Sequence, residues 1–324
     1  MERVLIFGLG NIALRHISNI RRLFPGVSIG VVTSRNRKIN TQEHLVDTQL
    51  SSIESINSFR PDFIIIASPA SLHIKDYKKI HSLSVPILIE KPLSSSIDEA
   101  NLAINLDKQN PRSTVSLGYC LRYLPSLKIV KDIIDNGELG KIFNIHSEVG
   151  QYLPDWRKSK DYKHSVSASK NLGGGVLLEL SHEFDYLFYL FGVMKLEYSS
   201  IDNLGSLALD VDEISDVILR TDSNALCYLH LDFYQKTPCR RCSIIGEKAR
   251  INWDLIDNSV ELITGEKSKI IYSEPEYDKN NMYIDMLKDL LTAHNNKSTA
   301  PITLESGSYI VKLISDIKIM AEYE

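Results

Sequence analysis

The stretch Val4-Leu5-Ile6-Phe7-Gly8-Leu9-Gly10-Asn11-Ile12-Ala13 decides the fold of this chain. Its first four residues form a short, continuous apolar run, which is typical of a strand buried on both faces. A G-x-G-x-x-A turn follows, and Ile17, Ile20 and Leu23 then predict a helix. A strand, this turn and a helix, in that order, are the fingerprint of a dinucleotide-binding fold.

Each fixed position of this G-x-G-x-x-A turn has its own physical reason. Gly8 allows a tight turn, Gly10 lets a pyrophosphate approach the backbone, and Ala13 permits close packing of helix on strand. The helix N-terminus offers N–H groups and a positive dipole to the phosphates. We therefore expect a nicotinamide dinucleotide to contact Gly8, Gly10, Asn11 and Ile12.

The end of the second predicted strand, 27–33, bears on the choice of cofactor. An Asp or Glu there would hold the ribose 2′-hydroxyl of NAD, but the chain continues Thr33-Ser34-Arg35-Asn36-Arg37-Lys38. Arginine can hold a 2′-phosphate bidentately. The sequence thus favours NADP over NAD, with Ser34, Arg35 and Arg37 as contacts. The alternative is a solvated basic loop.

Three further apolar runs predict strands over 63–67, 86–89 and 114–117, separated by helical segments near 72–83 and 97–109. This alternation predicts a parallel sheet. Ligands bind beyond the carboxyl ends of such strands, where this chain places Ser68-Pro69, Glu90-Lys91-Pro92 and Gly118-Tyr119. Lys91 directly follows a buried strand and precedes a proline. Because desolvation there can bring a lysine into the acid–base range, Lys91 is a catalytic candidate.

From Lys141 onward, alternating strands predict a largely antiparallel sheet with one covered face. The predicted strands are 141–149, 213–220, 225–234, 240–246, 249–253 and 258–263. Helices are expected over 125–136, 280–293 and 305–321. The fold class is therefore α/β, with a Rossmann-type parallel sheet in residues 1–120. Residues 121–324 form an α+β domain with an open, largely antiparallel sheet.

Between the three glycines at 173–175 and Gly192, the sequence predicts an apolar helix of about four turns. Glu179, His182, Glu183 and Tyr186 fall at i, i+3, i+4 and i+7, so they share one stripe. An acid and an imidazole on an oily helix need partners or a cleft. Glycines at the helix start would leave room for a ligand. The alternative is a core histidine bonded to Glu179.

Composition excludes several other classes of function. The net charge is -4, which gives no electrostatic case for nucleic acid or an anionic membrane. Cys239 and Cys242 form one C-x-x-C without a second pair, so we expect no metal site. No signal peptide or membrane span is visible, and we expect a cytoplasmic protein.

On these motifs, the chain resembles the Gfo/Idh/MocA oxidoreductases, such as glucose–fructose oxidoreductase and inositol dehydrogenase. The matching residues are Gly8 to Ala13, Ser68-Pro69 with Leu72-His73, Glu90-Lys91-Pro92, Gly118 to Pro125, and Gly173 to His182. The resemblance implies NAD or NADP, bound also by Ser68, Pro69, His73, Glu90 and Lys91. It further implies hydride transfer at a hydroxyl-bearing sugar or cyclitol carbon, with Lys91 and His182 serving the hydroxyl proton.

The chain departs from the family in one respect. The family has an Asp four residues before the histidine, whereas this chain has Glu179 three residues before it. We expect Glu179 to orient or charge His182. The stretch 152–157 is similar to the branch found in bacterial surface-sugar pathways, including nonulosonic acids. The resemblance also implies a homo-oligomer, a dimer or tetramer, that assembles through the C-terminal sheet.

The expected substrate contacts are Tyr119, Arg122, Trp156, Arg157 and Tyr162. Arg122 has a surface salt bridge as its alternative. The loop 150–172 is long and aromatic, which favours a substrate lid over an exposed flexible loop. Two other functions stay open: an NAD-linked dehydrogenase of a free cyclitol or sugar acid, and a catalytically silent ligand sensor.

Overall fold

The computed structural model describes residues 1–33, 45–157 and 161–323 of the chain. These residues form two compact units. The first unit contains Met1–Tyr119 and Tyr283–Val311, and the second contains Cys120–Met282 and the residues from Lys312 onward.

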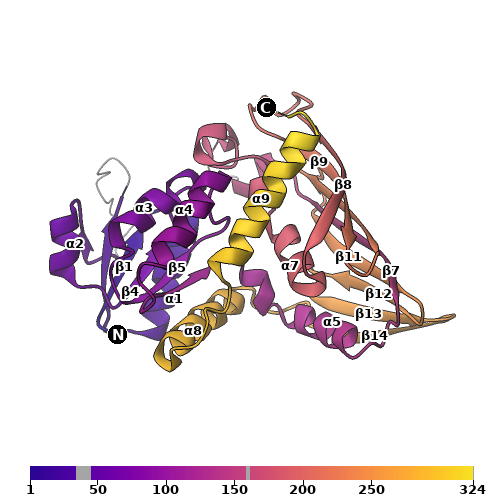
Figure 1. Cartoon of the computed structure of the whole chain (residues 1–324), viewed down its shortest axis with the longest axis horizontal. Coiled ribbons are helices and arrows are strands. Elements are labelled where there is room, and N and C mark those ends of the chain that lie inside the picture. Colours follow the sequence, from indigo (N-terminus) through magenta and orange to yellow (C-terminus); the bar gives the residue numbers. More distant parts are fainter. Residues whose placement is uncertain (34–44, 158–160, 324) are drawn as a thin grey trace. The chain divides into compact units, whose positions relative to one another are not determined.

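A parallel sheet of six strands forms the centre of the first unit, in the order β3-β2-β1-β4-β5-β6. Figure 1 labels β1, β4 and β5 of this sheet. Its strands are β1 (Arg3–Phe7), β2 (Ser28–Val32), β3 (Thr48–Gln49), β4 (Phe63–Ile66), β5 (Pro86–Ile89) and β6 (Thr114–Leu117). Every residue of β4 and β5 is buried, so both faces of the sheet are covered there. This confirms the Rossmann-type sheet that the continuous apolar runs predicted.

Helices connect these strands. They are α1 (Asn11–Leu23), α2 (Ile53–Phe59), α3 (His73–Ile80) and α4 (Ile97–Asp107). Two more helices, α8 (Asn280–Asn296) and α9 (Leu304–Met320), follow the last strand of the chain. The helix expected over 72–83 is a 3₁₀ turn, η3 (Ala70–Leu72), followed by α3. Strand β3 and helix α2 were not predicted from the sequence, because elements this short show little periodicity.

The segment Tyr283–Val311 packs with the first unit, although the sequence analysis placed all of 121–324 in one domain. The reason lies at β6. The Leu117 N–H donates to the carbonyl of Ile302 at 3.0 Å, and the Ile302 N–H donates to Ser116 Oγ at 3.2 Å. Helical periodicity alone does not show which sheet a helix will cover.

The second unit contains a sheet of eight strands in the order β14-β13-β12-β11-β7-β10-β9-β8. Its strands are β7 (Ile142–Gly150), β8 (Met194–Asp202), β9 (Ile214–Thr221), β10 (Leu226–Asp232), β11 (Cys239–Gly246), β12 (Arg250–Asp254), β13 (Ser259–Thr264) and β14 (Lys267–Ser273). Strands β7 and β10 pair in parallel, and the other neighbouring pairs are antiparallel. The largely antiparallel sheet is thus confirmed, with β8 and β14 as strands that the sequence analysis missed.

One face of this sheet is covered. Helices α5 (Pro125–Asp135) and α7 (His182–Phe191) lie against it (Figure 1), and Tyr186 of α7 bonds to Ser147 of β7. Burial alternates along β10, where Leu229 and Leu231 are buried and Tyr228 is exposed. The period of two follows because successive strand residues point to opposite faces.

The four-turn helix expected over 173–192 is wrong. The segment forms a short helix, α6 (Val176–Glu179), and then α7, with Leu180 and Ser181 between them. Leu180 leaves helical geometry at φ −98° and ψ 26°. Glu179 and His182 therefore lie at the end of one helix and the start of the next. They do not share a stripe of one helix with Glu183 and Tyr186.

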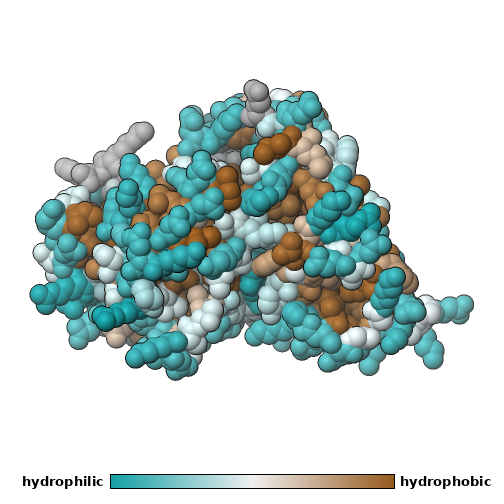
Figure 2. Space-filling view, viewed as in Figure 1, coloured by the Kyte–Doolittle hydropathy of each residue, from teal (hydrophilic) through white to brown (hydrophobic). Residues whose placement is uncertain are grey.

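The segment 150–172 contains three short 3₁₀ helices in its described part, η5 (Leu153–Arg157), η6 (Tyr162–His164) and η7 (Lys170–Leu172). A further one, η4 (Cys120–Tyr123), begins the second unit. Within the described residues, no helix is long and apolar enough to cross a membrane. The face of the molecule in Figure 2 is mostly hydrophilic, and its hydrophobic residues form separate areas.

Candidate active site

The glycine turn after β1 is shaped by its close approach to β4. Gly8 has φ +91°, and a Cβ placed on it would lie 2.5 Å from the Ala67 carbonyl oxygen. Glycine is the residue that tolerates both the left-handed backbone and this approach. Gly10 differs, since a Cβ placed there would have no described atom within 4 Å. The space beside Gly10 is available to a ligand.

The N-terminus of α1 adjoins that space. Gly10 is its N-cap residue and has no side chain to cap the helix, and the first turn carries no acid. Asn11 is exposed and Ile12 partly exposed, whereas Ala13 is buried against the strands. Uncapped N–H groups and the helix dipole favour an anion. These residues fit the pyrophosphate of a dinucleotide.

The expected contacts for a 2′-phosphate, Ser34, Arg35 and Arg37, lie outside the residues that the structure describes. The preceding strand, β2, is described. Thr33 follows β2 and is buried, and its Oγ1 accepts a hydrogen bond from Gln49 Nε2 at 2.8 Å.

Lys91 lies at the carboxyl end of β5 and is partly buried. The carboxylate of the preceding Glu90 is enclosed on two sides. His16 Nε2 donates to Glu90 Oε1 at 2.6 Å, and a Cβ placed on Gly118 would lie 2.9 Å from the same carboxylate. Glu90 is thus fixed by contacts with the chain itself.

His73 links two strand ends. Its side chain is buried, with Nδ1 2.9 Å from the Pro92 carbonyl oxygen and Nε2 2.8 Å from that of Ser68. Burial lowers the pKa of His73. Both ring nitrogens face carbonyl groups of the chain, so neither is directed at a cofactor. Ser68 and Pro69 are partly exposed at the end of β4.

In the second unit, the space beside Gly174 and Gly175 is filled by the protein. Gly175 has φ +102°, and a Cβ placed on it would overlap the Asp212 carboxylate. Asp212 Oδ2 accepts from the Leu177 N–H at 2.8 Å, which caps α6. A Cβ on Gly174 would lie 2.5 Å from the Val166 carbonyl oxygen. At Gly174 and Gly175, the expectation that the glycines leave room for a ligand is wrong.

His182 is the first residue of α7 and is partly exposed, as is Glu179 at the end of α6. Two buried acids follow in the first turn of α7. Glu183 receives hydrogen bonds from Arg240 at 2.7 and 3.1 Å. Asp185 receives them from Arg122, the shortest at 2.6 Å. Burial raises the pKa of Asp185, and Arg122 opposes that shift.

These pairs explain how α7 carries acids on an apolar helix. A buried carboxylate needs a cationic partner, and here the partners come from η4 and β11. Arg122 thus has the ion pair that was its alternative, although the pair is buried and not at the surface. Asp185 and Arg240 were not among the site residues predicted from the sequence. The need for partners on this helix was visible, but their identity was not.

The remaining expected substrate contacts have these places. Tyr119 is fully buried at the end of the first unit. Trp156 is partly exposed and meets Phe233 edge-on, with ring centroids 5.4 Å apart. The Tyr162 hydroxyl donates a hydrogen bond to the Leu207 carbonyl oxygen at 3.0 Å. Arg157 is the last residue of η5.

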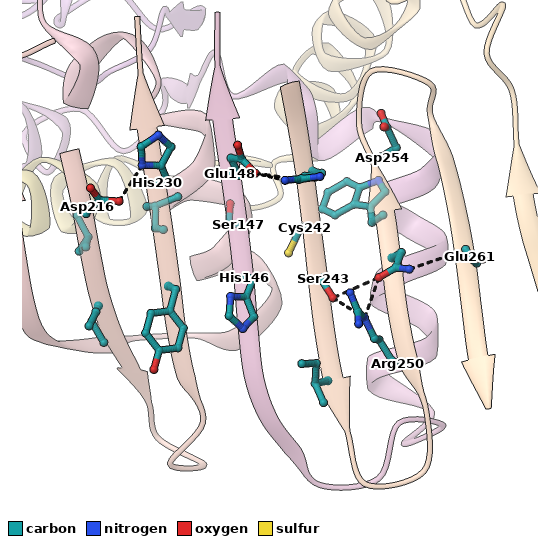
Figure 3. Close-up of a pocket in the computed structure, with 18 of the residues that line it drawn as sticks. His146, Ser147, Glu148, Asp216, His230, Cys242, Ser243, Arg250, Asp254 and Glu261 are labelled. Atoms are coloured by element: carbon teal, nitrogen blue, oxygen red, sulfur yellow. Dashed lines mark hydrogen bonds and ion pairs between the residues drawn. The ribbon is translucent and has the colours of Figure 1, made fainter. Parts of the chain in front are cut away.

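A hollow of about 1140 Å³ lies on the open face of the second sheet (Figure 3). Its polar lining includes His146, Glu148, Arg241 and His230. His230 Nδ1 donates to Asp216 at 2.7 Å and Nε2 to Asp232 at 3.1 Å. Asp232 and then Asp216 raise the pKa of His230 to about 9. The four cysteines are free thiols, and the described residues contain no cluster that could hold a metal ion.

Comparison with known proteins identifies the family. Residues 2–119 match the model "Oxidoreductase family, NAD-binding Rossmann fold", and residues 127–252 match "GFO/IDH/MocA C-terminal domain". The rhizopine catabolism protein MocA of Rhizobium meliloti is 26% identical over 156 residues, which is 48% of this chain and 46% of that protein. The chain spans about half the length of the first curated relatives it matches.

Solved structures share the fold. Levoglucosan dehydrogenase in complex with NADH and levoglucosan superposes with a TM-score of 0.84 at 15% identity, covering 99% of this chain and 97% of that one. The WlbA dehydrogenase from Bordetella pertussis, in complex with NADH and UDP-GlcNAcA, has a TM-score of 0.83 at 16% identity, covering 99% and 95%. Because the two family models together match residues of both units, the chain belongs to the Gfo/Idh/MocA oxidoreductase family.

Proposed function

We propose that this protein is an NAD(P)-dependent oxidoreductase that transfers a hydride between nicotinamide and a hydroxyl-bearing carbon of a sugar or sugar derivative. One observation carries the proposal: three strand ends that bear the cofactor turn and Lys91 are joined at one edge of the parallel sheet. Gly8 lies against Ala67 after β4, and His73 connects Ser68 with Pro92 after β5. Adjacent carboxyl ends of parallel strands are where such folds bind ligands.

The chain's own residues have distinct roles in this proposal. Gly8, Gly10 and the start of α1 bind the pyrophosphate, and Ser68, Pro69 and Glu90 line the same edge. Lys91 holds and relays the proton of the substrate hydroxyl, while His182 accepts it as general base in the oxidative direction. Glu179 orients His182. When bound, the nicotinamide supplies or accepts the hydride.

The catalytic roles are tested by Lys91→Ala and His182→Ala. Each is expected to lower hydride transfer at least ~100-fold while NADH and NADPH still bind, since general acid–base catalysis is worth about that much or more. Cofactor binding is followed by nicotinamide fluorescence, and turnover by absorbance. His81→Ala is the control, because His81 lies at the C-terminal end of α3 and has no role in the proposed site. An active Lys91→Ala/His182→Ala double variant contradicts the proposal.

For the substrate, we favour a sugar of bacterial surface-polysaccharide or nonulosonic-acid biosynthesis. The similarity to the WlbA dehydrogenase complex with UDP-GlcNAcA supports this choice. The similarity to levoglucosan dehydrogenase supports the alternative, a free sugar or cyclitol. A screen of UDP-GlcNAc, UDP-GlcNAcA, levoglucosan and myo-inositol, each with NAD⁺ and NADP⁺, separates the two. Turnover of only the free compounds overturns the first choice.

For the cofactor, we favour NADP on the basis of Ser34, Arg35 and Arg37. Titration with NADPH and NADH tests the choice. Tight NADPH and weak NADH binding support it, and Arg35→Ala/Arg37→Ala should then remove the difference. The reverse preference keeps the enzyme class and contradicts the assignment of these three residues. Binding of neither cofactor favours the silent sensor.

We also propose that the open face of the second sheet forms the contact of a homodimer or tetramer. Exposed apolar side chains support this, among them Tyr198 at 52% and Ile270 at 65% exposure, both in the lining of the hollow. Ile270→Asp is expected to lower the mass measured by light scattering. Ile319→Asp, at a residue of α9 with 71% exposure, is the matched control. A monomeric parent protein contradicts the proposal.

A further inference from the structure

Two buried histidines contact the residues that flank Lys91 in the sequence. His16 contacts the side chain of the residue before it, Glu90, and His73 contacts the carbonyl of the residue after it, Pro92. We infer that His16 and His73 are positioning residues that together fix the backbone from which Lys91 projects. The inference rests on the proposed role of Lys91, and it assigns a task to two residues that touch no reacting atom.

The contact of His16 with Glu90 is enclosed. The His16 side chain is fully buried in α1, the Glu90 side chain is 7% exposed, and their nitrogen and oxygen lie 2.6 Å apart. A Cβ on Gly118 would come within 3.0 Å of both carboxylate oxygens, so the carboxylate has no space to move toward β6. Glu90 Oε2 in turn accepts from the backbone N–H of Lys91 at 3.3 Å. A fixed Glu90 therefore restrains Lys91 on its N-terminal side.

The His16 ring is itself held in place. Tyr283, at the start of α8, meets it edge-on with ring centroids 5.9 Å apart. The Arg15 guanidinium lies 4.7 Å from the centroid of the same tyrosine ring. His16 also belongs to α1, whose first turn begins at Gly10. The contact thus connects the helix that receives the pyrophosphate with the strand end that carries Lys91.

His73 restrains Lys91 on its C-terminal side. Its Nδ1 lies 2.9 Å from the Pro92 carbonyl oxygen, and its Nε2 lies 2.8 Å from that of Ser68, after β4. A carbonyl only accepts and a neutral imidazole carries one N–H, so the ring donates a hydrogen bond to one of these carbonyls and contacts the other. The ring thereby bridges the two loops that follow β4 and β5. Because β4 and β5 are neighbours in the sheet, the bridge ties the turn of Lys91 to the edge where Ser68 and Pro69 lie.

Burial and hydrogen bonding of two histidines would also suit a purely structural role. The two roles differ in what they predict for Lys91. A structural role lowers stability and leaves the surroundings of the lysine ammonium unchanged. A positioning role changes them, because the titration of a lysine depends on its local solvation and neighbouring charges.

The test follows the titration of Lys91 without any substrate. The full-length protein is reductively methylated with ¹³C-formaldehyde, and the Lys91 dimethylamine resonance is assigned as the one that is absent in Lys91→Arg. Its chemical shift is measured against pH in the parent, His16→Leu and His73→Leu. We expect each leucine variant to move the midpoint by about half a pH unit or more. Ile17→Val, at a fully buried residue of α1, is the control and should leave the midpoint unchanged.

Conservative variants show whether the hydrogen bond is the cause. Gln at position 16 places a donor near the former Nε2, whereas Asn is too short to reach Glu90. At position 73 the order reverses, because Asn places a donor near the former Nδ1. We expect His16→Gln and His73→Asn to keep the parent midpoint and His16→Asn and His73→Gln to shift it. If a leucine variant does not fold, the comparison of the Gln and Asn variants at the same position tests the inference.

A Lys91 midpoint that is the same in the parent and in all folded variants overturns the inference and leaves both histidines with a structural role. The failure of the proposed function is distinguishable, because the titration requires neither cofactor nor turnover. Full hydride transfer by Lys91→Ala would remove the proposed role of Lys91. It would not alter the measured dependence of its surroundings on His16 and His73.

Discussion

Two helices of this protein begin after glycines, and only one of them offers its N-terminus to a ligand. At α1 the N-cap residue Gly10 has no side chain to cap the helix, and the space beside it has no described atom within 4 Å. At α6 the carboxylate of Asp212 lies against Gly175 and accepts the Leu177 N–H. A helix that begins after glycine can thus receive an anionic ligand, as we propose for α1, or a carboxylate of the chain itself, as at α6.

The largest effect in this comparison is expected at Gly175. Gly175→Ala adds a Cβ that overlaps Asp212, at φ +102°. Overpacking and a strained backbone together should lower the free energy of unfolding by about 3 kcal/mol. Urea denaturation measures it. Cofactor affinity, measured on the folded protein, should stay unchanged. A loss of affinity with normal stability would mean that these glycines do face a ligand.

A smaller loss is expected at Asp212. Asp212→Ala removes the cap of α6 and the ion pair with Lys318, whose Nζ lies 3.2 Å from Oδ1. The free energy of unfolding should fall by about 2 kcal/mol, of which the cap accounts for most. Asp212→Asn keeps a capping acceptor and is the matched control, with a smaller loss. Equal losses in the two variants would contradict the capping role.

Gly10→Ala tests the other helix start. Its φ of −82° suits any residue, and no described atom lies near its Cβ position, so stability should change by no more than about 0.5 kcal/mol. The same Cβ would obstruct a pyrophosphate. Affinity for NADH and NADPH should therefore fall at least ~10-fold, which is about 1.4 kcal/mol. Unchanged affinity in a fluorescence titration would place the cofactor elsewhere.

The smallest effect is expected at His230 on the open face of the second sheet, where the carboxylates of Asp216 and Asp232 accept hydrogen bonds from the imidazolium. Asp232 and Asp216 raise the pKa of His230 from 6.5 to about 9. A raised pKa in the folded state gives stability that is full below about pH 6.5 and is lost as the pH rises toward 9. The side chain is 32% exposed, so we expect the loss to be about 1 kcal/mol.

Urea denaturation of the parent and of His230→Gln across that pH range checks this prediction, at one protein concentration to hold any assembly constant. The variant should show a flatter dependence of stability on pH between these two limits. An equal slope in both proteins would assign the pH dependence to other groups.

Much of the fold follows from sequence patterns. Continuous apolar runs at β1, β4 and β5 predicted buried parallel strands, and alternation at β10 predicted a sheet with one covered face. Because Lys91 and the glycine turn closely follow apolar strand runs, the sequence predicted that both lie at the carboxyl ends of strands. Such local features depend on residues close together in the chain. The contacts Ser34, Arg35 and Arg37 stay predictions, because they lie outside the described residues.

What depends on partners far apart in the chain could not be predicted. The pattern of residues 173–192 indicated one helix, and the structure divides it in two, with Asp212 capping the first part. Asp185 is separated by 63 residues from Arg122, and His16 by 74 residues from Glu90.

The sequence by itself determined the parallel sheet, the glycine turn and the position of Lys91, because periodicity and turn chemistry are properties of neighbouring residues. Only the tertiary structure decided which carboxylate, carbonyl or open space lies beside each glycine and histidine. It also assigned Tyr283–Val311 to the first unit. The physical reason is that a buried polar group needs a partner, and any distant residue of the right chemistry can provide it.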